Sequence, residues 1–558
     1  MDLGTTFSCV SLLDERGWPS LALDAENSPL VPSVLWFDGH EAWVGMAAYR
    51  REEEKPGGFV DYIKRDMGKP AEIPPHLYDA PDAPDTAPYR YDGYAFGPVG
   101  MQALLLRALK RHALRHAART GQLPESWSEE HVVPDAVITV PAYFKDIERE
   151  QTRQAGEIAG LRVVGILNEP TAAALAYRPN ASGRRRLVVF DLGGGTFDVT
   201  ILDLMPDGSS KVLASDGNPR LGGKDFDQPL EDHLRAVCFL NRGEAVPPAY
   251  EVRLRREATS AKIRLSTRDE TEIVVTRPDG EAVRVSVMRR RPDDVNPYDF
   301  SSNTFYFESR AQNLLTSVRA ICERTRRSVR LPTPDGSERE MLWADVDEVV
   351  MVGGSCRMPM IPDLLATLTG KHVQRHPPEG FDFDTAVAVG AGRYAERPDL
   401  VEDVMWGTLG VKLRKRMEGM DLDFVRPLIR KNAPLPTRSE QRFKAGANAV
   451  LELYVGESDN PDDCILLGRL ELGNPEGEVT VVVAVDPHGR TTAHVHFVSS
   501  PSGEPVTRQL IIRNDLFAPH LAELAARVRR VRLHDSPDNG QSRPQGSSGA
   551  NPSAPLDL

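Results

Sequence analysis

The sequence has little that would suit a membrane protein, a disulfide-stabilised protein or a nucleic-acid binder. It contains no run of 18 or more apolar residues, and its start has neither the basic nor the apolar segment of a secretory signal. The 5 cysteines are scattered and include no Cys-x-x-Cys pair, which argues against a disulfide framework and a zinc site. With 68 Lys and Arg against 81 Asp and Glu, the net charge of −13 disfavours phosphate backbones as partners. We therefore expect a cytoplasmic protein that binds no membrane and no nucleic acid.

The length of 558 residues predicts three or four folding units of ordinary globular composition. Strand-like and helix-like segments alternate to about residue 395, which is typical of α/β layers. Beyond that point, short strands with turn signals predict a separate β-rich module. Helices are expected at about 101–119, 148–158 and 519–530. The Pro- and Asp-rich stretch 70–98 is expected to be irregular.

Two segments place an acidic residue ahead of glycines and hydroxyl side chains, namely Asp2-Leu3-Gly4-Thr5-Thr6 and the run from Asp191 to Asp198. The second lies between two apolar strands, so its glycines should form a hairpin tip where backbone N–H groups can approach phosphate oxygens. Either segment alone is as well explained by a plain glycine-rich hairpin. Their first aspartates are 189 positions apart. That spacing predicts two similar halves that each contribute one phosphate loop to a nucleotide bound between them.

A third glycine turn, Gly353-Gly354-Ser355, closes the apolar strand 348–352. Such a turn alone more often reflects chain topology than ligand binding. Its position after two phosphate loops favours a place beside the adenine or ribose. Cys356, which follows it, is expected to be a small buried residue rather than a reactive thiol.

With these loops in place, the sequence resembles the 70-kDa heat-shock chaperones of the DnaK type, within the actin-like ATPase superfamily. Six motifs occur in the family's order and at its spacing, whereas other actin-like kinases share only the glycine loops. The motifs are Asp2 to Thr6, Val140 to Phe144, Asn168 to Tyr177, Asp191 to Asp198, Leu221 to Asp227 and Val352 to Pro359. The resemblance covers residues 1 to about 396 densely and continues more faintly to about 513.

The resemblance implies a two-lobed α/β actin-like (ribonuclease-H-like) ATPase domain followed by a β-sandwich domain. The implied boundaries are 1–398 for the ATPase domain, 399–411 for the linker, 412–515 for the substrate-binding-like sandwich, 516–535 for a short helical segment and 536–558 for a disordered tail. Too few residues follow the sandwich for the family's helical lid. The implied activity is slow, Mg²⁺-dependent hydrolysis of ATP to ADP coupled to binding of extended, unfolded polypeptides. J-domain co-chaperones and nucleotide exchange factors are the further partners that it suggests.

Carried over residue by residue, the resemblance assigns Asp2, Glu169 and Asp191 to Mg²⁺ through its waters. It assigns catalysis to Lys64, Glu169, Asp191, Thr196 and Asp198, with Lys64 at the γ-phosphate and Asp198 orienting the attacking water. The implied nucleotide contacts are Gly4, Thr5, Thr6, Gly193, Gly194, Gly195, Gly222, Gly223, Lys262, Ser266, Gly353, Gly354, Ser355, Arg357 and Asp384. Pro141 and Arg149 match a proline switch and an arginine relay that couple nucleotide state to the peptide domain.

Several positions depart from the family pattern. Met1 directly precedes Asp2, so the strand that presents Asp2 is expected to begin half-formed and to hold the first loop less rigidly. Thr259 replaces a ribose-binding glutamate, which predicts weaker nucleotide affinity, and Gly165 replaces a basic residue implicated in co-chaperone and linker docking. The linker is shorter and poorer in leucine, which reduces the contacts that allostery requires. Arg442 replaces a small apolar residue of the peptide pocket, where a buried charge would be costly.

These departures leave two alternatives to a cycling chaperone. One is a nucleotide-binding scaffold or holdase that keeps the fold without an allosteric cycle. The other is a small-molecule kinase of the same superfamily, which the motif from Asn168 to Tyr177 and the trailing β-rich module disfavour.

Overall fold

The computed structural model describes residues 1–24, 27–38, 41–52, 58–68, 90–91, 94–124, 126–177, 183–292, 303–417, 420–446, 448–487, 489–499, 504–510 and 518–535. Most of the segment 70–98, expected to be irregular, lies outside these residues. The tail expected to be disordered at 536–558 lies outside them as well.

A first lobe surrounds one apolar core and contains the N-terminal strands and the longest helix. Helix α3 begins three residues before the expected 101, because Pro98 suits the first turn of a helix and the following Ala- and Leu-rich run continues it. Helix α4 agrees with the expected 148–158 to within two residues. The strands are β1 (Phe7–Cys9), β2 (Ser11–Leu13), β3 (Pro19–Leu21), β4 (Leu30–Pro32), β5 (Leu35–Phe37), β6 (Ala42–Val44), β7 (Phe59–Val60), β8 (Arg90–Tyr91), β9 (Tyr94–Ala95), β10 (Asp135–Val140) and β11 (Arg162–Asn168), and the helices are α1 (Met46–Arg51), α3 (Pro98–Arg119), α4 (Asp146–Ile158) and the 3-10 turn η2 (Ile63–Asp66).

A second lobe is built on a twisted sheet in the order β20-β12-β13-β14-β21. Strands β12 and β13 are buried along nearly their whole length, as expected for central strands covered on both faces. The strands of this lobe are β12 (Arg185–Leu192), β13 (Phe197–Leu204), β14 (Ser210–Asn218), β15 (Glu270–Thr276), β16 (Ala282–Met288), β17 (Thr304–Tyr306), β18 (Arg330–Pro332), β19 (Glu338–Glu340), β20 (Glu348–Val352) and β21 (Val401–Glu402). Its helices are α6 (Gly223–Cys238), α7 (Pro248–Leu265), α8 (Phe307–Arg310), α9 (Gln312–Ser328), α10 (Met360–Thr369) and the short turns η3 (Leu240–Arg242), η4 (Trp343–Asp345), η5 (Gly354–Arg357) and η6 (Pro398–Leu400).

Two helices, α5 (Glu169–Ala176) and α11 (Ala386–Glu396), pack against each other between the lobes. Their backbones approach so closely that a Cβ atom on Gly390 would lie 1.7 Å from the carbonyl oxygen of Ala172. A larger side chain at position 390 would therefore force the two helices apart.

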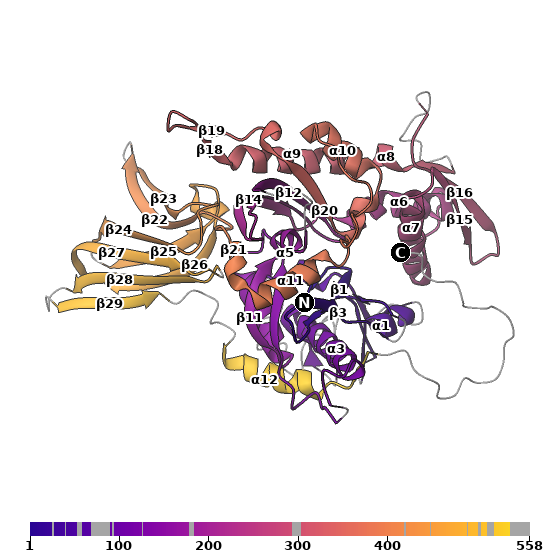
Figure 1. Cartoon of the computed structure of the whole chain (residues 1–558), viewed down its shortest axis with the longest axis horizontal. Helices are drawn as coiled ribbons and strands as arrows, with labels where there is room; N and C mark the ends of the chain where they lie inside the picture. The colour runs from indigo at the N-terminus through magenta and orange to yellow at the C-terminus, as the bar shows by residue number, and fades with distance from the viewer. Residues whose placement is uncertain are drawn as a thin grey trace.

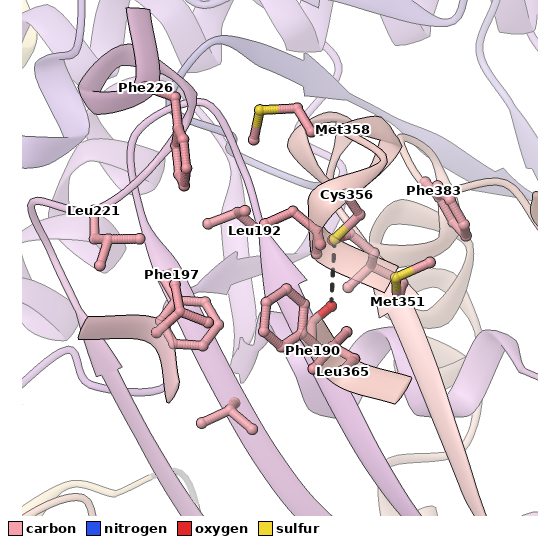
Figure 2. Packing of buried hydrophobic residues seen from close by; sticks show 14 of the residues in the cluster. Phe190, Leu192, Phe197, Leu221, Phe226, Met351, Cys356, Met358, Leu365 and Phe383 are labelled. Carbon is pink, nitrogen blue, oxygen red and sulfur yellow. Dashed lines mark hydrogen bonds between the residues drawn. The ribbon is translucent and has the colours of Figure 1, made fainter. Parts of the chain in front are cut away.

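Figure 2 shows part of the apolar core of the second lobe, where Phe190, Leu192 and Phe197 of the β12–β13 hairpin lie near Met351 and Cys356. Phe190 and Phe197 face each other across the β12–β13 hairpin, with ring centroids 4.8 Å apart. Cys356 is fully buried there, and its Sγ donates to the carbonyl oxygens of Val352 at 3.0 Å and Phe190 at 3.9 Å. Burial raises the pKa of the Cys356 thiol well above its ordinary value. The sequence-based expectation of an unreactive, small buried residue is confirmed.

A β-sandwich of two sheets, β23-β22-β25-β26 and β24-β27-β28-β29, lies to one side of the two lobes (Figure 1). Val, Leu and Phe side chains from both sheets form its core. The strands are β22 (Leu409–Met417), β23 (Met420–Ile429), β24 (Thr437–Lys444), β25 (Ala449–Val455), β26 (Ile465–Gly473), β27 (Pro475–Val485), β28 (Thr491–Ser499) and β29 (Glu504–Leu510), with the turn η7 (Pro461–Asp463).

Strand β24 alternates half-buried and exposed residues along its length. Arg442 lies on the exposed face, whereas the neighbouring Phe443 packs against the sandwich core. The register of β24 turns Arg442 to solvent, so the cost of a buried charge does not arise at this position, and an altered peptide groove stays a prediction.

The connection between the ATPase-like lobes and the sandwich is short in the structure. Strand β21 adds to the second-lobe sheet beside β14, and β22 of the sandwich already begins at Leu409. Residues 403–408 are left as the connecting stretch.

The helix expected at about 519–530 is present as α12 (Ala518–Arg530), and a short strand, β30 (Leu533–His534), follows it. Both lie on the first lobe beside α3 and α4, away from the strands of the sandwich (Figure 1). Among the described residues, no helix is long and apolar enough to cross a membrane.

Candidate active site

Asp2 lies at the end of a short extended segment that is paired on both sides. Its backbone exchanges hydrogen bonds with Cys9 at 2.8 and 2.9 Å, while the carbonyl of Met1 accepts from Thr139 and its amino group donates to Val137. The Thr139 hydroxyl also donates to the Asp2 carboxylate at 3.1 Å. The expected half-formed strand is present, because Asp2 forms only an isolated bridge with Cys9 and the first strand, β1, begins at Phe7. Hydrogen bonds to residues 9, 137 and 139 nevertheless hold this segment on both sides, and the looser placement of the first loop stays a prediction.

Lys64 and Glu169 form a buried ion pair at the centre of the site, with side chains only 4% and 7% exposed. Lys64 lies in the turn η2, and Glu169 begins helix α5 immediately after strand β11. A lysine at this depth is not an ordinary solvated surface residue. The structure thus agrees with the placement that the resemblance implied.

The β12–β13 hairpin brings two further carboxylates into the same place. Asp191 and Asp198 are directly paired across the hairpin, and Gly193 donates to the carbonyl of Thr196 at 3.1 Å to close its tip. The Oδ1 atom of Asp198 accepts from the amide of Ala142 at 3.1 Å. Its Oδ2 atom is buried and accepts no hydrogen bond from any described residue.

The site therefore gathers four carboxylates around the Lys64 ammonium group, and the buried amino group of Met1 lies close to Asp2. Burial, with repulsion from Glu169 second, raises the pKa of Asp2 to about 7 and raises those of Asp191 and Asp198 well above their ordinary values. Within the described part of the chain, no three His, Cys, Asp or Glu side chains are close enough together to ligate a metal directly. A cluster of carboxylates suits a hydrated divalent cation, which the carboxylates would hold through its water molecules. The Oδ2 atom of Asp198 is available to accept a hydrogen bond from such a water molecule.

The predicted phosphate loops meet at close range. Cβ atoms on Gly194 and Gly195 would collide with the side chains of Thr6 and Thr5, at 1.8 and 2.2 Å. A Cβ on Gly222, at the start of α6, would lie 2.5 Å from the backbone of Gly195. The two loops that are 189 positions apart in the sequence thus form one cradle, in which positions 194, 195 and 222 have no room for a side chain.

The third glycine turn joins this cradle from the other side. Ser355 Oγ donates to the carbonyl of Gly193 at 2.9 Å, and Lys262 Nζ on α7 donates to the carbonyl of Gly223 at 2.8 Å. Gly353 adopts φ +85°, and a Cβ atom there would lie 2.4 Å from the carbonyl oxygen of Leu192. The turn therefore requires glycine for both conformation and space.

The remaining residues expected at the adenosine lie next to this turn. Arg357 pairs with Asp384 at 2.5 Å, and a Cβ on Gly354 would lie 2.8 Å from the Asp384 carboxylate. Lys262 and Ser266 line a pocket together with Met358 and Pro359. Thr259, at the position of the missing glutamate, donates to Asp227, which is also the ion-pair partner of Lys262.

Arg65 is a residue of this site that sequence reasoning did not single out. Its Nε donates to the carbonyl of Gly195 at 2.7 Å, and its Nη2 pairs with Asp225 at 2.5 Å, so it joins the first lobe to the hairpin tip and α6. The available signal was its position directly after Lys64 in the same motif.

A chain of hydrogen bonds leads from the carboxylates to the connecting stretch. Arg149 is buried and donates to the carbonyl of Phe144 at 2.8 Å and to the side chain of Asn168. Asn168 in turn donates to Asp403 at 2.8 Å, and its neighbour in the chain is Glu169 of the ion pair. Pro141 directly precedes Ala142, which donates to Asp198. Asn168 and Asp403 were not predicted as relay residues.

The sandwich touches both lobes. The carboxylate of Asp146, at the start of α4, accepts from Trp406 Nε1 and from Thr491 Oγ1, both at 2.8 Å. On the second lobe, Asp216 pairs with Lys431 of the sandwich at 3.4 Å. Burial raises the pKa of Asp146 above its ordinary value.

Gly165, which replaces a basic residue of the family pattern, faces Tyr394 of α11. A Cβ atom on Gly165 would lie 3.1 Å from the Tyr394 ring. The tyrosine thus occupies the space that a longer side chain at position 165 would need.

Comparison with known proteins gives one consistent result. Residues 1–507 match the family model described as "Hsp70 protein". A protein of Deinococcus deserti named "Chaperone protein DnaK" is 31% identical over 530 residues, which covers 90% of this chain and 77% of the relative. The protein of the same name from Deinococcus radiodurans is 32% identical over 532 residues, with the same coverage of both chains.

Proposed function

Because the chain belongs to the 70-kDa heat-shock protein (Hsp70) family, it is an ATP-dependent molecular chaperone with ATPase activity, and we propose that the carboxylate cluster around Lys64 hydrolyses the ATP. The family binds ATP and ADP and acts on unfolded polypeptides with the help of co-chaperones. We further propose that residues 1–402 form the actin-like ATPase domain and that residues 409–510 form the substrate-binding sandwich.

The observation that carries the catalytic assignment is the buried set of four carboxylates opposed by one lysine. Phosphoryl transfer needs charge neutralisation and in-line positioning rather than covalent chemistry. When bound, Mg²⁺ would neutralise the β- and γ-phosphates of ATP, and Asp2, Glu169 and Asp191 are the residues that would hold it through its waters. The excess negative charge at this point supports that assignment.

The remaining roles fall to groups with free hydrogen-bonding capacity. We assign Asp198 to orient the attacking water, because its buried Oδ2 accepts no hydrogen bond from the described residues. Lys64 would turn from Glu169 toward the γ-phosphate and stabilise the charge that develops there. Thr5, Thr6 and Thr196, with the N–H groups of the glycine cradle, would hold the phosphates in line.

The hydrogen-bond chain through Asn168 supports coupling between the nucleotide and the sandwich. Glu169 contacts Lys64, whereas Asn168, one residue earlier, contacts Arg149 and Asp403. A shift of Glu169 toward a bound cation would therefore move the residue that holds the connecting stretch. These contacts favour a cycling chaperone over a non-cycling scaffold in spite of the short linker.

Single-turnover hydrolysis of Mg·ATP by the full chain tests the assignment. We expect Lys64→Ala to slow hydrolysis by about 10²-fold or more, because it removes a cation from the developing charge. Lys211→Ala is the matched control, since Lys211 is 42% exposed and pairs with Glu402 at 2.6 Å, away from the carboxylate cluster. ATP binding by both variants is measured in parallel to establish that the fold is intact.

An extended apolar peptide and a set of sugars and polyols are added to separate the alternatives. Stimulation by the peptide supports coupling. A rate of ATP hydrolysis that is the same with and without the peptide contradicts coupling, but it is compatible with hydrolysis at the carboxylate cluster. ATP binding without turnover indicates the scaffold, and ATP consumption that depends on a sugar or polyol indicates the kinase. Equal rates for Lys64→Ala and the parent protein refute the role of Lys64.

A further inference from the structure

Residues 518–535, which we call the C-terminal clasp, fold onto the first lobe rather than onto the sandwich that precedes them (Figure 1). Strand β30 pairs in parallel with β6, so the sheet order is β30-β6-β5-β7. The register places Leu533 beside Ala42 and His534 beside Trp43, and the amide of Ala42 donates to the carbonyl of Arg532 at 3.2 Å. The clasp thus supplies an edge strand of a first-lobe sheet.

The apolar side chains of the clasp are part of the first-lobe core. Val528 is 0% and Val531 2% exposed, and both belong to the cluster that contains the buried leucines of α3. Leu524 approaches α3 so closely that its Cδ1 would lie 3.2 Å from a Cβ on Gly100. Burial of this kind is typical of a domain interior rather than of a transient contact.

A row of arginines on α3 binds the backbone end of the clasp. Arg107 is buried and donates to the carbonyl of Val528, in the last turn of α12, at 2.8 Å and to that of Val531, just after the helix, at 3.0 Å. Arg111 donates to the carbonyl of Leu533 at 3.0 Å. Glu129 holds both guanidinium groups, at 2.7 and 2.6 Å.

A second polar cluster fixes the strand β30. Glu41 pairs with Arg532 at 2.9 Å and lies 3.0 Å from the imidazole of His534. The ring of His534 stacks on Trp43, with centroids 4.9 Å apart and planes 16° apart. The C-terminal half of the clasp, from Val528 to His534, is therefore held by specific polar and aromatic contacts.

We propose that the clasp is a permanent part of the first lobe in every nucleotide state, so that the sandwich is attached to the ATPase domain at both of its ends. At its first end, β21 belongs to the second-lobe sheet. At its other end, the seven residues 511–517 separate β29 from the clasp, and a stretch of that length spans at most about 25–30 Å. The sandwich can then tilt or loosen against the lobes but cannot swing away from them.

The proposal is independent of whether hydrolysis is coupled to peptide binding, because it concerns only the attachment of the clasp. The test is hydrogen–deuterium exchange of the full chain with Mg·ADP and with Mg·ATP. We expect the amides of residues 528–534 to be protected in both states, at rates that agree within about threefold. Deprotection of these amides in either state overturns the proposal and makes the clasp a nucleotide-driven lid.

Substitutions on α3 test whether the hydrogen bonds from this helix protect the amides of residues 528–534 against exchange. Arg107→Leu removes two hydrogen bonds to the clasp and should speed exchange at residues 528–534 by about tenfold or more. Arg119→Leu is the matched control, since Arg119 lies on the same helix and donates to the backbone of residues 23 and 24. Equal effects of the two variants refute the role of Arg107.

A second measurement does not depend on substitution of buried residues. A protease site placed within residues 511–517 allows the chain to be cut between the sandwich and the clasp. The released peptide should co-elute with the rest of the protein in size-exclusion chromatography with either nucleotide, because its apolar side chains stay in the lobe core. Dissociation of the cut peptide with ADP or with ATP overturns the proposal.

Discussion

Removing the hydroxyl of Thr491 should release the sandwich from the first lobe. Thr491 donates to the buried Asp146 carboxylate at 2.8 Å, and Trp406 Nε1 donates to the same carboxylate at 2.8 Å. Thr491→Val preserves the shape and the strand preference of the side chain. It leaves a buried carboxylate with one donor fewer, so the docked state loses a charge-assisted hydrogen bond.

Such a bond contributes roughly 1.5–3 kcal/mol, which corresponds to a shift of about 10- to 150-fold in the docking equilibrium. Native-state proteolysis with chymotrypsin measures that shift, because cleavage after Trp406 requires the connecting stretch to leave its contacts. With opening fast relative to cleavage, the cleavage rate follows the open population. We expect the variant to be cut about 10-fold faster or more in the presence of Mg·ATP.

Thr492→Val is the matched control, since Thr492 is the next residue of β28 and its exposed hydroxyl donates within the sandwich to Ala484. It should leave the cleavage rate unchanged. If both variants are cut at the rate of the parent protein, the bond between Thr491 and Asp146 does not hold the docked state and the reasoning fails.

Two further predictions concern the nucleotide site. Burial raises the pKa of Asp2 to about 7, so the stability that this group contributes is fully present below about pH 4 and is lost as the pH rises to 7. Asp2→Asn should therefore raise the free energy of unfolding of the metal-free protein at pH 8, by at most roughly 4 kcal/mol, and leave it unchanged at pH 4. Calorimetry at both pH values measures the difference between the variant and the parent protein, and a difference that is the same at pH 4 and pH 8 contradicts this prediction. Gly222→Ala places a Cβ atom 2.5 Å from the backbone of Gly195 and should weaken ATP binding by about tenfold or more in a titration. Gly446→Ala is the control, because a Cβ atom at position 446 would have no atom within 4 Å and should leave ATP binding unchanged. Equal affinities of the two variants would show that the cradle can relax around the added methyl group.

The sequence was sufficient to predict the parts of the site that lie on continuous motifs. The two phosphate loops, the glycine turn at 353–355 and the strands that carry them appear where the alternation of apolar strands and glycine turns placed them. Membership of the family is confirmed by the comparisons. Lys64 needed the resemblance, because nothing in the composition of its segment distinguishes it from a solvated surface lysine.

The contacts between domains were not predictable from local patterns. Asp146 and Thr491 are 345 positions apart, and Asn168 and Asp403 are 235 apart. Short-range periodicity carries no information about such pairs, because they depend on how whole domains pack. The same reason applies to the segment of Asp2, whose hydrogen bonds to residues 137 and 139 on β10 could not be predicted from its own sequence.

The pairing of β30 with β6 also bears on how the chain reaches its native state during synthesis. The strand partners His534 and Trp43 are 491 positions apart, so the sheet of the first lobe stays incomplete until the residues of β30 have been synthesised. An apolar surface of that lobe is uncovered throughout this time. An isolated fragment that ends before β30 should therefore be less soluble than the full chain.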